Sequence, residues 1–141
     1  MHFHGINHVS LRVTNLARAS QFYTHVLSLK PHPEKPNWLG VGQGCLVHLM
    51  EPTTAGSDSP PEPSRHFALE VSRLEDVVAL LLRHGLKPYQ SDVTQHHHRE
   101  IKSDQDSLDF GIGTVFVVDP DGNVIEFMQK GRGIFAEFDP A

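Results

Sequence analysis

The 141-residue chain has a single cysteine, Cys45, no long apolar run and no cluster of basic residues. One cysteine cannot form a disulfide within the chain, so a reducing compartment is expected. No apolar run approaches the length that spans a membrane. The first residues, Met-His-Phe-His-Gly, lack the charged and apolar regions of a signal peptide. These absences predict a cytoplasmic protein without a membrane partner.

Basic charge is also scarce, since the formal net charge is −5 at pH 7. This balance disfavours nucleic acid as a partner. Apolar residues make up 38% of the chain and charged residues 21%, which is typical of a soluble globular protein. A chain of this length suits one domain, or two small halves that share a core.

Histidine, by contrast, is abundant, with eleven residues. It is the commonest metal ligand among side chains. Hydrophobic periodicity predicts helices over 15–28 and after the capping box Ser72-Arg73-Leu74-Glu75, the second ending at Gly85. Alternating or continuous apolar runs predict strands over 6–13, 38–41, 45–51, 65–72, 114–118 and 124–128. The segment 91–109 reads as a polar insertion, and His96-His97-His98 within it as part of a solvated loop, with a role in a pocket left open.

The two halves of the sequence repeat each other. His8-Val-Ser-Leu-Arg-Val-Thr-x-Leu16 matches His66-Phe-Ala-Leu-Glu-Val-Ser-x-Leu74 at an offset of 58. Leu29-Lys30-Pro31 matches Leu86-Lys87-Pro88 at an offset of 57, and 44–50 matches 122–128 at 78. The insertion at 91–109 absorbs the larger offset. Each half therefore reads as strand, helix and about three strands.

This repeat predicts the domain organisation. We expect a first βαβββ unit over 1–51, a linker rich in proline, serine and threonine over 52–64, a second βαβββ unit over 65–130 and an irregular tail over 131–141. Neither unit can bury a sheet face alone, so the two should pair. The predicted fold is α+β, with both units in one curved mixed sheet and helices on its outer face.

Strand parity locates the candidate site. Alternate residues of a strand share one parity and point to the same face of the sheet. On each outer strand the residues of one parity are apolar and should pack on the helices. The other parity carries His8, His48, His66 and Glu126 at equivalent positions of the repeat. A single strand histidine is more often structural than a ligand. Three imidazoles and a carboxylate that converge from four strands would form a transition-metal site.

At this point the chain resembles the vicinal oxygen chelate superfamily, which includes glyoxalase I, fosfomycin and bleomycin resistance proteins and extradiol dioxygenases. The resemblance spans about 6–130. The segments that carry it are Asn7-His8-Val9-Ser10-Leu11-Arg12-Val13, Phe22-Tyr23-x-x-Val26-Leu27, His66-Phe67-Ala68-Leu69-Glu70-Val71 and Asp119-Pro120-Asp121-Gly122-Asn123-Val124-Ile125-Glu126.

The resemblance implies that His8, His66 and Glu126 are metal ligands, and that His48 stands where glyoxalase I has another polar ligand. It also implies a homodimer, with the site either within one chain or shared between two. One divalent ion per site is expected: iron, zinc, nickel, cobalt or manganese.

Glu126 is the only carboxylate of the set, so a divalent ion there would leave a charge of about +1, which favours a small anionic, oxygen-chelating substrate. Two mechanisms remain open, with Glu126 and His48 as the catalytic candidates. In a ring-cleaving dioxygenase, His8, His66 and Glu126 would hold iron and His48 would act as an acid–base. In a glyoxalase-like lyase or isomerase, all four residues would hold the metal.

The second class of function is a metal-free binding protein of the bleomycin-resistance type. Such a protein sequesters its ligand in an apolar, aromatic groove. Trp38, Tyr89 and Phe116 are the candidate lining residues of that pocket. The complete set of four metal-capable residues favours the enzyme over the binding protein.

Overall fold

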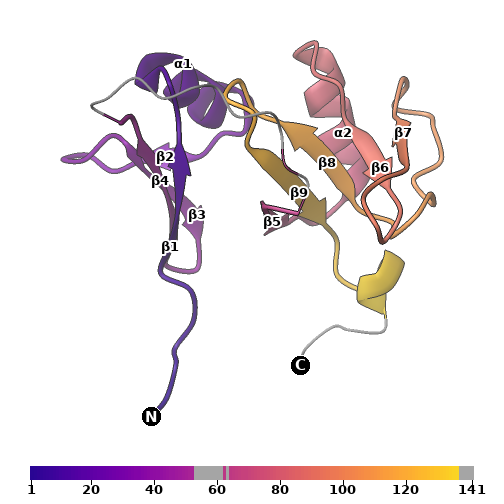
Figure 1. The fold of residues 1–141 in the computed structure, drawn as a ribbon, viewed down its shortest axis with the longest axis horizontal. Coiled ribbons are helices and arrows are strands. Elements are labelled where there is room, and N and C mark those ends of the chain that lie inside the picture. Colours follow the sequence, from indigo (N-terminus) through magenta and orange to yellow (C-terminus); the bar gives the residue numbers. More distant parts are fainter. Residues whose placement is uncertain (53–61, 63, 137–141) are drawn as a thin grey trace. The chain divides into compact units, whose positions relative to one another are not determined.

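A computed structural model describes residues 1–52, 62 and 64–136, which form two compact units, Met1–Pro60 and Pro61–Ala141 (Figure 1). Each unit is a mixed β-sheet with one main helical segment, so the predicted α+β class is confirmed. The linker expected over 52–64 falls almost entirely outside the described residues.

The first unit runs from a strand through a helix to three further strands. Its elements are β1 (His8–Arg12), α1 (Leu16–Gln21), the π-helical turn η1 (Phe22–Val26), β2 (Lys30–Pro31), β3 (Trp38–Gly42) and β4 (Cys45–Met50). The order in the sheet is β1-β4-β3-β2. β1 is parallel to β4, and the other pairs are antiparallel.

The second unit repeats this arrangement with one strand added. Its elements are β5 (His66–Glu70), α2 (Leu74–Arg83), β6 (Tyr89–Ser91), β7 (His98–Glu100), β8 (Val115–Val118), β9 (Val124–Met128) and the 3₁₀ turn η2 (Gly133–Ala136). The order is β5-β9-β8-β6-β7, with β5 parallel to β9. Without β7 it matches the first unit strand for strand, which confirms the predicted repeat.

The helical segment of the first unit contains one residue more than its counterpart. This is the residue by which the offset of the repeat falls from 58 to 57. It is accommodated in η1, where the Leu27 amide donates to the Phe22 carbonyl five residues earlier (3.2 Å). A π-turn absorbs one inserted residue without ending the helix. The helix predicted over 15–28 is accordingly helical over 16–26.

The start of α2 differs from the prediction. Its N-cap is Arg73, which makes no side-chain capping bond, so the capping box expected at Ser72 is wrong. The Leu74 amide instead donates to Gln129 Oε1 (3.0 Å), just beyond β9. In the first unit the Leu16 amide likewise donates to Glu51 Oε2 (2.9 Å), just beyond β4. Both helices thus obtain an N-terminal acceptor from the end of the neighbouring parallel strand.

The end of α2 follows the prediction. The Gly85 amide donates to Leu82 and the Leu86 amide to Leu81, and Gly85 has a φ of 74°. This pair of bonds is the Schellman motif, which needs a left-handed residue after the helix. Ser28 takes the corresponding place after η1 with a φ of 61°.

The insertion at 91–109 is more ordered than a polar loop. It contains β7, and Ile101 and Leu108 are buried within it. The buried amide of Gln90 holds the segment, because it donates to the carbonyls of Leu108 and Thr114 and accepts from the Phe110 amide. Part of the tail expected to be irregular forms η2, where the Ile134 amide donates to the Ile112 carbonyl.

Burial follows the predicted parity in β1, β4 and β5, whereas β9 buries residues of both parities, Glu126 among them. In β1 and β5 the residues Val9, Leu11, Phe67 and Leu69 are less exposed than their neighbours, and in β4 Val47 and Leu49 are buried on either side of His48. α2 contacts β9 and buries its apolar face, formed by Leu74, Val77, Val78 and Leu81. No helix among the described residues is both long and apolar enough to cross a membrane.

Candidate metal centre

His66 and Glu126 form a close pair in the second unit. His66 Nε2 lies 3.0 Å from Glu126 Oε2. The other carboxylate oxygen, Oε1, accepts a hydrogen bond from Thr114 Oγ1 at 2.7 Å. Glu126 is only 5% exposed and Thr114 is fully buried. A buried carboxylate needs such partners, because an isolated one would be strongly disfavoured away from water.

The strand register explains how these two residues meet. β5 and β9 are parallel, with Ala68 opposite Glu126. His66 is two residues before Ala68, so it projects from the same face of the sheet. On the other side of β9, Phe116 of β8 lies opposite Glu126. The Phe116 ring is fully buried and meets the His66 ring edge-on, with 5.6 Å between centroids.

The first unit builds the equivalent arrangement from His8, His48 and Trp38. Ser10 lies opposite His48 in the parallel pair, and Trp38 of β3 lies opposite His48 on the other side. The Trp38 indole stacks on the His48 ring at 3.8 Å and 11°, and meets the His8 ring at 4.8 Å. The two imidazole centroids are 6.2 Å apart.

The two units therefore present the same pattern in the same register. A histidine comes from the first strand, a second metal-capable residue from the last strand, and an aromatic ring from the strand beside it. Each unit brings together two of the four predicted ligands. Among the described residues of either unit, no group of three or more histidine, cysteine, aspartate or glutamate side chains is arranged to hold a metal.

Both pairs have donor chemistry suited to a divalent transition metal. Two ligand atoms that each lie about 2.1 Å from one ion are separated by about 3.0 Å at an octahedral angle and about 3.4 Å at a tetrahedral one. The His66 Nε2 and Glu126 Oε2 atoms already have the octahedral separation. His8 Nδ1 lies 2.8 Å from the Asn7 amide oxygen, which can only accept. Nδ1 therefore donates, and in the neutral ring this leaves Nε2 with the lone pair that a metal needs.

The charge state of His48 also suits a ligand. Loss of water around the ring, and then repulsion from His8, lower the pKa of His48 below its ordinary value of 6.5. Both effects disfavour the imidazolium form. Both effects therefore favour the neutral ring, which metal coordination requires.

Two of the three predicted lining residues, Trp38 and Phe116, contact candidate ligands of their own unit, and Tyr89 contacts Phe116. Tyr89 stacks on Phe116 at 5.5 Å, which in turn contacts His66. His98 continues this row of rings, since it stacks on Tyr89 at 4.5 Å. Assigning His98 to a solvated loop overlooked this contact, because the hairpin of β6 and β7 was not predicted.

Thr114 was also missed as a site residue. Its position carried a signal, since it has the same strand parity as Phe116, and β8 lies beside the strand that carries Glu126. The sequence prediction counted Thr114 only as the first residue of the buried strand 114–118.

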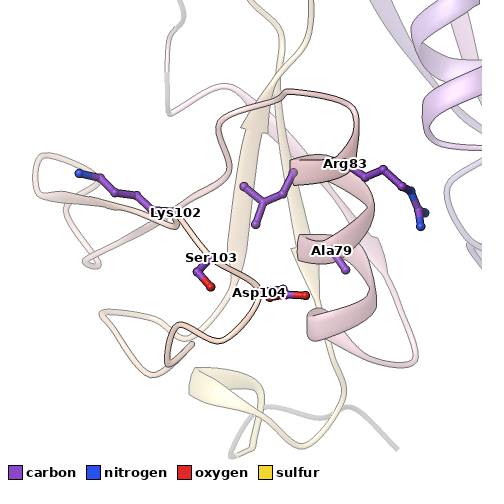
Figure 2. Close-up of a pocket in the computed structure, with 6 residues that line it drawn as sticks. Ala79, Arg83, Lys102, Ser103 and Asp104 are labelled. Carbon is purple, nitrogen blue, oxygen red and sulfur yellow. The ribbon is translucent and has the colours of Figure 1, made fainter.

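A separate surface pocket of about 530 Å³ lies between α2 and the segment after β7. Its lining residues are Ala79, Leu82, Arg83, Lys102, Ser103 and Asp104. Figure 2 shows the long side chains of Arg83 and Lys102 directed away from each other and from the centre of the pocket. None of the candidate site residues lines it, and it presents no convergent set of polar groups.

Comparison with known proteins matches the chain to one family. The family model described as the Glyoxalase/Bleomycin resistance protein/Dioxygenase superfamily matches residues 5–127. The metallothiol transferase FosB of Shouchella clausii (strain KSM-K16) is 26% identical over 125 residues, which cover 86% of this chain and 77% of FosB.

The solved structures that share the fold include two with different functions. The trypanothione-dependent glyoxalase I of Leishmania major matches with a TM-score of 0.61 and 24% identity, over 90% of this chain and 87% of that one. TnmS3, an antibiotic binding protein from Streptomyces sp. CB03234, matches with a TM-score of 0.58 and 18% identity, over 92% of this chain and 98% of that one. The fold thus occurs both in an enzyme and in a binding protein.

Proposed function

The chain belongs to the Glyoxalase/Bleomycin resistance protein/Dioxygenase superfamily, and on this premise we propose that it is a divalent-metal-dependent enzyme acting on a small anionic, oxygen-chelating substrate. The observation that carries the proposal is the buried Glu126 carboxylate, 3.0 Å from His66, in the same register as His48 beside His8. The similarity to a metallothiol transferase supports the same class of function.

In this proposal His8, His48, His66 and Glu126 hold one iron, zinc, nickel, cobalt or manganese ion, with the residues drawn from one chain or from the two chains of a homodimer. The ion, when bound, supplies a Lewis acid that polarises the coordinated oxygens of the substrate. With Glu126 as the only carboxylate, the centre has a charge of about +1, which favours an enolate, catecholate or phosphonate.

In this proposal Glu126, His48 and Phe116 each have a further role beside the metal. Glu126 is held by Thr114 at Oε1, which leaves Oε2, the oxygen that faces His66, to bind the metal or, when released from it, to accept a proton. His48 is either the fourth ligand or an acid–base beside the metal, and its lowered pKa suits both roles. The buried ring of Phe116 excludes water from one side of the carboxylate.

A metal-free binding protein is the second candidate. Its supporting observation is that Trp38 and Phe116 lie against candidate ligand residues, and that Tyr89 stacks on Phe116. Planar rings of this kind could bind an aromatic drug by stacking. The paired donor atoms in both units favour the enzyme, since a binding protein has no need of them.

Elemental analysis separates the two candidates. Untagged protein should be purified, stripped of metal and incubated in turn with iron, nickel, cobalt, zinc and manganese. The enzyme proposal expects about one ion per site, and His66→Ala should lose most of it. His25→Ala, which changes an exposed histidine, should bind as wild type does. Wild-type protein that stays metal-free with all five ions would overturn the proposal in favour of the binding protein.

The homodimer and the cytoplasmic location also belong to the proposal. The first is tested by light scattering after size-exclusion chromatography, where a monomer would contradict it. The free thiol of Cys45 supports a reducing compartment.

A further inference from the structure

We infer that Thr114 is a positioning residue, which fixes the Glu126 carboxylate so that it offers a single oxygen to the metal. The inference rests on the proposed function, in which Glu126 is a ligand. Thr114 Oγ1 donates to Glu126 Oε1 at 2.7 Å, while Oε2 faces His66 at 3.0 Å. The hydroxyl thus occupies one carboxylate oxygen and leaves the other directed at the neighbouring ligand.

Thr114 is itself rigidly held. It is fully buried directly before β8, and its carbonyl accepts a hydrogen bond from Gln90 Nε2. The same amide group donates to the Leu108 carbonyl and accepts from Phe110, so the backbone around Thr114 is tied to two other segments. A β-branched side chain has few rotamers on such a backbone. The hydroxyl therefore has a defined position before any metal binds.

Within residues 1–52 of the first unit, no hydroxyl holds His48 in this way. The repeat offset of 78 places Pro36 where the second unit has Thr114, and a proline side chain cannot donate a hydrogen bond. His48, the counterpart of Glu126, is instead oriented by stacking on Trp38. A carboxylate has two equivalent oxygens and rotates about its last bond, so it needs a fixed donor, whereas a flat ring is held by another ring.

Loss of a hydrogen bond to a ligating carboxylate commonly weakens metal binding by about 10–100-fold. Thr114→Val removes the hydroxyl and keeps the side-chain shape, whereas Thr114→Ser keeps the hydroxyl. Titration calorimetry with Co²⁺ should show a Kd raised by about 10–100-fold in Thr114→Val and close to wild type in Thr114→Ser. The visible spectrum of bound Co²⁺ should change in Thr114→Val, because the freed carboxylate can bind through both oxygens.

Thr24→Val is the matched control, since the Thr24 hydroxyl donates to the Ser20 carbonyl in the first unit, and this variant should bind Co²⁺ as wild type does. Thr114→Ala serves in place of Thr114→Val if the valine variant does not fold. Wild-type affinity and spectrum in Thr114→Val, or in Thr114→Ala where it replaces the valine variant, would refute the role of Thr114 while leaving the metal centre intact. Weakening in Thr114→Ser equal to that in Thr114→Val would refute it too. Absence of Co²⁺ binding in wild type would overturn the role of Thr114, and failure of every ion in the elemental analysis would overturn the proposed function as well.

Discussion

The indole ring of Trp38 stacks on the imidazole ring of His48, with 3.8 Å between centroids and 11° between planes. Trp38 is the only tryptophan of the chain, and it also meets His8 edge-on at 4.8 Å. The intrinsic tryptophan fluorescence therefore comes from a ring in contact with two proposed ligands.

This contact predicts a direct optical signal of metal binding. Adding Co²⁺ or Ni²⁺ to metal-free protein should quench the Trp38 emission in a saturable way, because these ions quench nearby excited indoles. His48→Ala and His66→Ala should shift the titration to higher metal concentration. His84→Ala, which changes an exposed residue after α2, should titrate as wild type does. Unaltered titrations in both ligand variants would contradict the four-residue centre.

The Arg132–Glu75 pair predicts a pH-dependent contribution to stability. Arg132 Nη1 donates to Glu75 Oε1 at 2.6 Å, and this bond is the main reason that the pKa of Glu75 is lowered below 4.5. Because the folded state favours the charged form, the stabilisation is present above pH 4.5 and is lost as the pH falls through the lower folded pKa.

Glu75→Gln should therefore cost about 0.5 kcal/mol at pH 7, a value typical of a partly exposed pair, and almost nothing in strong acid. Urea denaturation at several pH values measures this difference. Asp76→Asn is the control. Asp76 lies 3.7 Å from Arg73 with both side chains largely exposed, so its replacement should change the free energy of unfolding little at any pH. An equal cost at all pH values would contradict the prediction.

Gly111 is predicted to be irreplaceable. A Cβ atom there would lie 1.9 Å from the Ser91 carbonyl oxygen, and that carbonyl already accepts from the Ile112 amide. Gly111→Ala should cost about 3 kcal/mol or more in the free energy of unfolding, since backbone must move. Gly131→Ala has a similar positive φ but open space around it, so it should cost only about 1–2 kcal/mol. Urea midpoints compare the two, and equal costs would contradict the close approach.

The bond from the Leu74 amide to Gln129 predicts that Gln129 stabilises the start of α2. Gln129→Ala should cost about 1 kcal/mol, comparable with loss of an N-cap side chain, because it leaves a helix amide without its acceptor. Gln105→Ala, at an exposed position, should be neutral. The measurement is again urea denaturation, and a Gln129→Ala variant as stable as wild type would show that water replaces the side chain.

Much of the fold could be predicted because the repeat and the period of two are local properties of the sequence. They gave the order of the main elements, the core parity of β1, β4 and β5, and the left-handed residue Gly85. The offset between the two halves of the repeat also falls from 58 to 57 across the helix, and this change indicates the extra residue that the π-turn η1 accommodates. The capping box at Ser72 failed because a side chain 55 residues away supplied the acceptor instead.

The candidate site divides in the same way. The sequence determined which residues share a strand face, and hence named His8, His48, His66 and Glu126 before any contact was known. Only the tertiary structure decided that Thr114 holds Glu126, that Trp38 stacks on His48 and that His98 reaches Tyr89. The physical reason is that parity depends on the chain's own alternation, whereas these contacts depend on the register between strands far apart in sequence and on the side-chain rotamers that packing selects.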